Sequence, residues 1–229
     1  MANIVLVHGS YQGGWIWQRV ASRLRAAGHV VHAPTLDGCA ERRHQLRPGI
    51  DTTVHATEIS ELLFYEDLRD AVLVGTSSGG MVVCRAAEQM RDRVARIVLV
   101  DALALFNGER TRDIVNRGAP MPSGLAAGPS REEAATGLFA DLDQATRDWV
   151  LDRYTPHPVG CSWLPVKLTD FWDMRWDASV IWCRQAANPG EAHQRRAAER
   201  LKARWHELDT GHYPMLSMPD ELTQLIVEG

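Results

Sequence analysis

Short apolar runs alternate with longer amphipathic stretches along the first hundred residues of the chain. The run from Ile4 to Val7 is continuously apolar and stops at a His-Gly pair, as a strand buried on both faces of a parallel sheet does. Residues 15–27 place apolar side chains at helical spacing and end at Gly28, a residue type that closes helices. The pattern therefore begins with a strand followed by a helix.

The same alternation continues toward the C-terminus and is interrupted once. We predict further strands over residues 30–33, 70–75, 95–100, 179–183 and 204–208. We predict further helices over residues 51–65, 79–91 and 191–203, and a last helix from Asp220. Strands that alternate with helices form a mostly parallel sheet flanked by helices. The sequence thus predicts an α/β fold with one core, built from residues 1–102 and 179–229.

The interrupting segment, residues 103–178, is rich in Pro, Gly and Trp, with a helical pattern near residues 143–154. We predict a cap inserted into the core and no independent domain, since 229 residues lie at the upper end of what one hydrophobic core supports. The segment holds four of the eight tryptophans: Trp149, Trp163, Trp172 and Trp176. They suit the wall of an apolar pocket, and they equally suit packing of the cap onto the sheet.

Composition and charge are those of an ordinary globular protein. The hydrophobic fraction is 45%, and no apolar stretch approaches the roughly 20 residues of a membrane span. The net charge of −4 has no block of like charge behind it, which argues against a nucleic-acid partner. No export signal is recognised, and the four cysteines form no metal-ligand spacing. We therefore predict a soluble, cytoplasmic protein with reduced thiols, no membrane partner, no metal and no cofactor.

Ser77 stands at the centre of a G-x-S-x-G motif, residues 75–79, between a predicted strand and a predicted helix. A sharp strand-to-helix turn forces its central residue into strained backbone geometry, and small flanking residues let the chain pass without a clash. Such a turn exposes the serine hydroxyl at the carboxyl edge of the sheet. We predict that Ser77 is a catalytic nucleophile.

A serine nucleophile needs a base, and the best-placed histidine is His212. It follows the last predicted strand and precedes the last helix, which returns it to the same edge of the sheet. The loop after the first strand, His8 to Ser10, lies on that edge too. We predict that the backbone N–H groups of Ser10 and Ser78 form an oxyanion hole beside Gly9, and that His8 is structural.

Four segments of the chain carry motifs of one known group of enzymes. They are residues 7–15 (VHGSYQGGW), 35–42 (TLDGCAER), 73–81 (LVGTSSGGM) and 209–212 (DTGH). These segments resemble the α/β-hydrolase superfamily, in particular the group that joins plant methylesterases and hydroxynitrile lyases with bacterial EstC-type esterases. The resemblance spans nearly the whole chain and implies the α/β-hydrolase fold. It also implies that nucleophile, acid and histidine follow in that order along the chain.

The acid is where the sequence departs from the family. Its usual position follows the fifth predicted strand, and this chain has Ala186 there. Without a carboxylate the imidazole loses its orienting partner, which can lower kcat by about 10⁴ in serine hydrolases. Asp101 ends the fourth predicted strand at the same edge and is our first candidate. Glu191 and a dyad without an acid remain open, and Asp209 is expected to stabilise its loop.

The leading functional prediction is hydrolysis of an ester, thioester or lactone of an apolar small molecule through an acyl-enzyme. The rival is a biosynthetic tailoring enzyme for cyclisation, elimination or rearrangement, which would explain the missing acid. A hydroxynitrile lyase is disfavoured because Tyr213 and Gly9 stand where those relatives carry Lys and Thr. A non-catalytic receptor gives no reason to keep Ser77 together with His212. The expected partner is an apolar small molecule, and a homodimer remains open.

Overall fold

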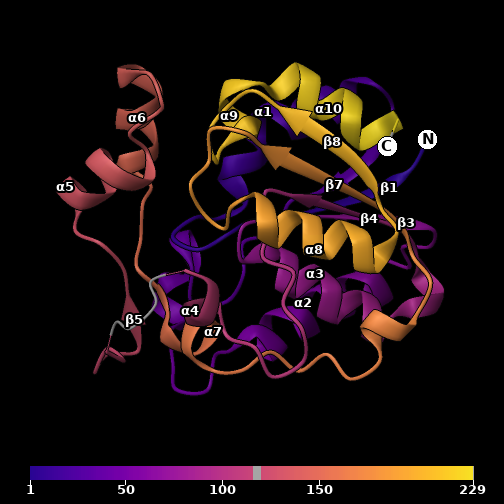
Figure 1. Cartoon of the computed structure of the whole chain (residues 1–229), viewed down its shortest axis with the longest axis horizontal. Helices are drawn as coiled ribbons and strands as arrows, with labels where there is room; N and C mark the ends of the chain where they lie inside the picture. The colour runs from indigo at the N-terminus through magenta and orange to yellow at the C-terminus, as the bar shows by residue number, and fades with distance from the viewer. Residues whose placement is uncertain (116–119, 229) are drawn as a thin grey trace.

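The computed structural model describes residues 1–115 and 120–228, and within them six parallel strands form one sheet in the order β2-β1-β3-β4-β7-β8 (Figure 1). The strands are β1 (Asn3–Val7), β2 (Val30–His32), β3 (Ala71–Thr76), β4 (Val94–Val100), β7 (Asp177–Cys183) and β8 (Arg204–Leu208). Both ends of the chain contribute strands to this sheet. The predicted α/β fold with a mostly parallel sheet is confirmed.

Helices cover both faces of the sheet. They are α1 (Gln18–Ala26), α9 (Pro214–Ser217) and α10 (Pro219–Glu228) on one face, and α2 (Thr52–Tyr65), α3 (Gly79–Gln89) and α8 (Glu191–Leu201) on the other (Figure 1). In β1, Ile4 and Leu6 pack toward the first group, and Val5 and Val7 toward the second. This two-sided burial is the reason that the strand is continuously apolar. No helix in the part of the chain that the structure describes is both long and apolar enough to cross a membrane.

One predicted helix is shorter than expected, and one observed helix was not predicted. Residues 15–27 form the end of a 3-10 turn followed by α1. The turn begins at Gly14, where a side chain would not fit, since a Cβ there would be 2.0 Å from the carbonyl oxygen of Ala33. The last helix, expected from Asp220, is present as α10, and the short helix α9, which was not predicted, ends before Pro219, a residue that lacks the N–H needed to continue a helix. The 3-10 helices are η1 (Gly14–Trp17), η2 (Ala40–Gln45), η3 (Arg91–Arg93) and η5 (Phe171–Asp173).

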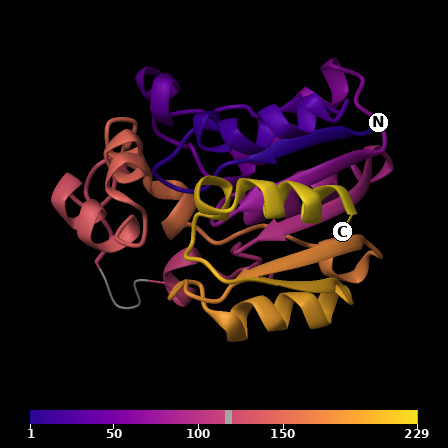
Figure 2. The same cartoon turned by 90° about the horizontal axis from the view of Figure 1, so that it is seen from above.

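Residues 103–178 leave the sheet after β4 and return to it at β7. Their middle part, residues 111–115 and 120–163, lies beyond the carboxyl ends of the strands, and we call it the lobe (Figure 1, Figure 2). Residues 116–119 of the predicted cap lie outside the described residues. The lobe contains α4 (Thr111–Ile114), β5 (Ala126–Ala127), α5 (Arg131–Glu133), a π-helical turn η4 (Ala134–Leu138), α6 (Gln144–Leu151), β6 (His157–Pro158) and α7 (Val159–Trp163). Strands β5 and β6 pair antiparallel.

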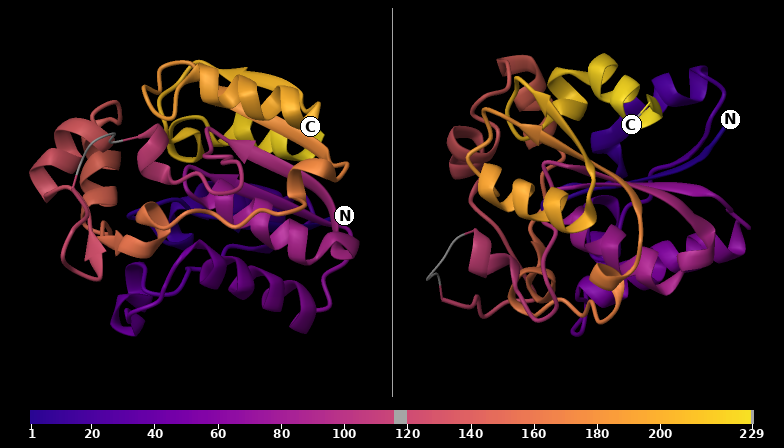
Figure 3. Two further views of the ribbon diagram at one scale, coloured as in Figure 1. Left: turned by 60° about the horizontal axis from the view of Figure 1, so that its bottom comes forward. Right: turned by 45° about the vertical axis from the view of Figure 1, so that its right-hand side comes forward.

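The last part of the predicted cap packs against the core. Residues 164–176 run back along the side of the sheet that carries α2 and α3, to the start of β7 (Figure 3). The indole N–H of Trp172 donates to the carbonyl oxygen of Leu105 at 3.0 Å, and that of Trp176 to the carbonyl oxygen of Phe171 at 2.9 Å. Both tryptophans belong to the buried core on this face. They therefore attach the segment to the core and line no pocket at the strand ends.

Candidate active site

Ser77 occupies a sharp turn between β3 and α3. Its φ of 50° lies in the left-handed region, which is strained for a residue with a side chain. The backbone can adopt this turn because the glycines on either side have no side chains that would clash with it. A Cβ on Gly75 would lie 2.7 Å from the carbonyl oxygen of Gly79, and one on Gly79 would lie 2.5 Å from that of His8. The turn geometry expected for the motif is therefore present at Ser77.

The imidazole of His212 contacts the carboxylate of Asp101. The distance between His212 Nδ1 and Asp101 Oδ2 is 2.5 Å, and the Asp101 side chain is fully buried. The second carboxylate oxygen, Oδ1, accepts a hydrogen bond from the N–H of Cys183 at 3.4 Å. A proton held on Nδ1 by Asp101 leaves Nε2 as the basic nitrogen of the imidazole.

Strand pairing brings Ser77 and Asp101 to the same edge of the sheet. Thr76 pairs with Val100 at the ends of β3 and β4, and Ser77 and Asp101 are the next residues on the two strands. Asp101 also has a positive φ, of 42°, so the chain turns sharply at both positions. The contact with Asp101 holds His212 at this edge.

The other carboxylates considered for the acid have different partners. Glu191 lies on the exposed side of α8 and forms an ion pair with Arg195 at 3.0 Å. Asp209 binds Arg184 at 3.2 Å and thereby ties the loop after β8 to the loop after β7. It stabilises its loop, as expected. Ala186, at the family's usual acid position, offers no carboxylate.

Ser10 and Ser78 link the loops that follow β1 and β3. Their hydroxyl oxygens lie 2.9 Å apart. Within residues 1–115 and 120–228, neither backbone N–H of these two serines donates to a protein acceptor. Two unpaired N–H groups next to Ser77 are what an oxyanion hole requires.

Gly9 lets the loop after β1 approach Ser77 closely, but its own N–H is already paired and adds no donor to the oxyanion hole. Its N–H donates to Gln12 Oε1 at 3.3 Å, and a Cβ on Gly9 would lie 2.6 Å from the Cβ of Ser77. His8 fixes the same loop: its Nδ1–H donates to the carbonyl oxygen of Gly9 at 2.8 Å, and its Nε2 accepts from the N–H of Leu36 at 3.0 Å. Burial lowers the pKa of His8 to about 4, so its ring is neutral. His8 is structural, as expected.

The model of the α/β-hydrolase family matches residues 4–225 of the chain. This chain belongs to the α/β-hydrolase family. A carbendazim hydrolyzing esterase of Nocardioides sp. (strain SG-4G) is 30% identical to it over 179 residues, 73% of this chain and 74% of the relative. Salicylic acid-binding protein 2 of Nicotiana tabacum is 36% identical over 147 residues, 60% of this chain and 56% of the relative.

The fold of this hydrolase also matches solved structures. An extracellular α/β-hydrolase from a Paenibacillus species superposes with a TM-score of 0.86 at 20% identity, covering 100% of this chain and 98% of that one. The resemblance stated from the sequence motifs is therefore confirmed. With it, the expectation of an esterase-type α/β-hydrolase is confirmed as well.

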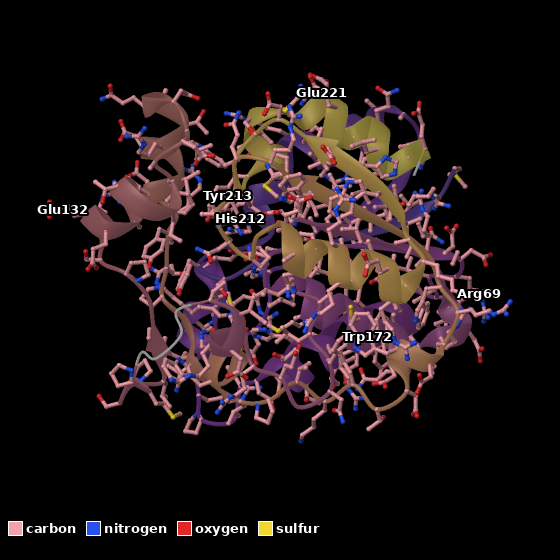
Figure 4. The ribbon with its side chains drawn as sticks, in the orientation of Figure 1. Arg69, Glu132, Trp172, His212, Tyr213 and Glu221 are labelled. Atoms are coloured by element: carbon pink, nitrogen blue, oxygen red, sulfur yellow. The ribbon has the colours of Figure 1, made fainter. Side chains whose placement is uncertain are left out.

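Aromatic side chains of this hydrolase gather beside His212. We call the four residues Tyr11, Phe139, Tyr154 and Tyr213 the aromatic cluster. The ring centroids of Phe139 and Tyr213 are 4.9 Å apart, those of Tyr11 and Tyr154 are 5.6 Å apart, and those of Phe139 and Tyr154 are 6.4 Å apart. Figure 4 shows His212 and Tyr213 at the side of the sheet that faces α5 and α6. The lobe thus brings two aromatic rings to the proposed catalytic edge.

The four tryptophans of residues 103–178 do not belong to this group beside His212. Trp149 packs edge-on against Trp15 with centroids 5.2 Å apart, and Trp163 lies beneath the guanidinium of Arg112 at 4.1 Å. Trp172 is well separated from the catalytic edge (Figure 4). The interpretation that these tryptophans pack the segment onto the core holds for Trp172 and Trp176. The aromatic residues beside His212 are therefore those of the aromatic cluster and not these tryptophans.

Two features of the hydrolase were not predicted from its sequence. Asp141 of the lobe packs against Gly211, where a Cβ would lie 1.6 Å from Asp141 Oδ2. No local pattern marks this aspartate, because the lobe brings it to the loop before His212. The structure also gathers three side chains that could hold a metal in one buried group: His55, His157 and Cys161.

Proposed function

We propose that this hydrolase is a serine esterase that cleaves carboxylic esters of apolar small molecules through an acyl-enzyme. The observation that carries the proposal is the 2.5 Å contact between His212 Nδ1 and Asp101 Oδ2, at the edge where Ser77 forms its strained turn. A carboxylate at Nδ1 keeps the imidazole in the tautomer whose Nε2 can accept a proton.

In the proposed reaction, Ser77 Oγ attacks the ester carbonyl carbon while His212 Nε2 takes the hydroxyl proton. The N–H groups of Ser10 and Ser78 bind the resulting oxyanion, and each such donor contributes about 2.7–4 kcal/mol to transition-state stabilisation. The imidazolium then protonates the leaving alcohol, and the acyl group stays on Ser77. Water that gives its proton to His212 attacks the acyl carbon, which releases the acid and restores the serine.

The surroundings of the site favour a neutral, apolar substrate. Tyr11 and Tyr154, the partly exposed members of the aromatic cluster, offer rings to an apolar acyl or alcohol group. The carboxylate of Asp141, next to Gly211, disfavours an anionic group on that side. Relatives are named as a carbendazim hydrolyzing esterase and as methylesterases, so carbendazim and neutral methyl esters are the first compounds to test. Four buried, unpaired cysteines support a cytoplasmic location within this proposal.

The tailoring-enzyme alternative depended on a missing acid. That argument came from Ala186 at the family's usual acid position. Because Asp101 contacts His212, the argument no longer favours a reaction other than hydrolysis. We therefore propose hydrolysis alone.

Turnover of neutral methyl and phenyl esters with acyl groups of graded size tests the proposal. We expect the wild-type enzyme to cleave them and, in quenched reactions, to gain the mass of one acyl group. Ser77→Ala should show neither turnover nor the mass increase, since no hydroxyl remains to be acylated. Turnover retained by Ser77→Ala, or no cleavage of any ester by the folded wild type, would overturn the proposal.

A further inference from the structure

Two cysteines and two histidines form a buried cluster where the lobe meets the core. We call Cys39, His55, His157 and Cys161 the Cys/His cluster. The first two belong to the core, with His55 on α2, and the last two belong to β6 and α7 of the lobe. None of the four is more than 5% exposed. The cluster shares no residue with those that we propose for ester cleavage, although the ring of His157 packs against Tyr11 of the aromatic cluster with centroids 6.1 Å apart.

The sulfur and nitrogen atoms of the cluster form two close pairs, and those of three of its residues lie near enough to hold one metal ion together. Cys161 Sγ lies 3.5 Å from His55 Nδ1, and Cys39 Sγ lies 3.5 Å from His157 Nδ1. The ligand atoms of His55, His157 and Cys161 all lie within 4.8 Å of one another. Tetrahedral Zn²⁺, with nitrogen at about 2.0–2.1 Å and sulfur at about 2.3 Å, sets a nitrogen and a sulfur about 3.6 Å apart. The two close sulfur–nitrogen pairs match this value, and the wider separations, up to 4.8 Å, have to close by about 1 Å when an ion binds.

The protonation of the histidines also suits a metal. His55 Nε2 lies 2.9 Å from the carbonyl oxygen of Asp37, which can only accept, so the ring proton is on Nε2 and the lone pair of Nδ1 faces Cys161. Metal-bound histidines commonly donate their other ring N–H in this way.

Charge balance favours a divalent ion. Without a metal, the cluster holds two weak S–H···N hydrogen bonds, and burial raises the pKa of both thiols. A divalent ion displaces the two thiol protons to solvent, and the two thiolates that remain cancel its charge. A neutral centre avoids the large penalty for burying an uncompensated charge. Two sulfur and two imidazole ligands are a set typical of Zn²⁺.

We propose that the Cys/His cluster binds one Zn²⁺ ion that fastens the lobe to the core. The ion joins α2 and the segment after β2 to β6 and α7, elements that are distant in sequence. All the ligands are buried, so the ion enters while the chain folds. Zinc stabilises the folded chain because the unfolded chain lacks the assembled site.

The wild-type chain provides the first test. Protein expressed in zinc-supplemented medium should contain one zinc per chain by elemental analysis. After unfolding with a chelator and anaerobic refolding, one equivalent of Zn²⁺ should bind, and free Zn²⁺ at about a thousand times Kd should raise Tm by about 10 °C. Co²⁺ in place of Zn²⁺ should give the absorption of a thiolate-bound tetrahedral ion. None of these readouts depends on ester cleavage.

Cys161→Ala and Cys84→Ala form a matched pair of variants. Each removes one buried thiol, but Cys84 lies on α3 outside the cluster. Cys84→Ala should bind zinc as the wild type does, whereas Cys161→Ala should lose at least about 100-fold in affinity. Equal losses in the two variants would overturn the proposal. If Cys161→Ala does not fold, the wild-type titration decides: refolded wild type that binds no stoichiometric zinc also overturns the proposal.

Discussion

Replacing Asp101 by Asn perturbs the contact on which the proposed mechanism depends. The fully buried carboxylate of Asp101 lies 2.5 Å from His212 Nδ1. An amide of nearly the same volume carries no charge to stabilise the imidazolium, and its NH₂ group can donate to Nδ1 and so favour the wrong tautomer. The lost charge-assisted hydrogen bond alone is worth about 1.5–3 kcal/mol, or about 10- to 150-fold in rate. With the tautomer inverted, we expect kcat to fall by about 10⁴, or about 5.4 kcal/mol.

The assay is steady-state cleavage of a neutral phenyl ester, with circular dichroism and Tm as checks on folding. Glu191→Gln is the matched control, because it makes the same chemical change at an exposed carboxylate that pairs with Arg195. It should leave kcat within about two-fold, since surface ion pairs contribute little. Turnover of Asp101→Asn within a few-fold of wild type would refute the reasoning, and Ser77 and His212 would then act as a dyad.

Three further predictions follow from the loops around Ser77. Gly9→Ala places a Cβ 2.6 Å from the Cβ of Ser77, so ester turnover should fall by about 100-fold or more; unchanged turnover would contradict the close approach. Ser10→Ala and Ser78→Ala should each lower kcat by about 2- to 10-fold, and the double variant should lose little more than either, because the two hydroxyls act as one pair; additive losses would show that they act separately. The pKa of His8 is lowered to about 4, so between pH 7 and pH 5 the unfolded chain binds a proton that the folded chain does not. In urea titrations over this range, His8→Gln should lose about 2 kcal/mol less stability than the wild type, to whose loss the other buried histidines also contribute; an equal loss in both would contradict this source.

The sheet could be predicted from the sequence because its strands carry a two-sided apolar pattern. Val5 and Ile4 face different helical layers, so the central strands are largely apolar and are easily told from the amphipathic helices, whereas the edge strand β8 carries Arg204, His206 and Glu207. The course of residues 103–178 could not be predicted in the same way. Trp172 and Trp176 pack on elements distant in sequence, and no local pattern distinguishes such packing from a pocket wall. Those distant contacts also divide the segment into the lobe and residues 164–176, which pack along the core.

The candidate site shows the same limit. Ser77 and His212 lie in local motifs whose turns are defined by adjacent residues, so both could be proposed from the sequence. The contact between His212 and Asp101 joins residues 111 positions apart, and the sequence could only offer Asp101 as one candidate among several. Asp141 reaches the loop before His212 only because the lobe folds over the sheet edge. The Cys/His cluster was not predicted from the sequence, because His157 and Cys161 of the lobe meet partners that come from the core.

Labelling with a fluorophosphonate, followed by peptide mapping, tests the central claim most directly: that Ser77 is the nucleophile and His212 its base. We predict one adduct per chain, located on Ser77 and absent from Ser77→Ala. In His212→Ala the labelling rate should fall by several orders of magnitude, because the hydroxyl then keeps its proton at neutral pH. An adduct on Ser78, or folded wild-type protein that stays unlabelled, would contradict the account.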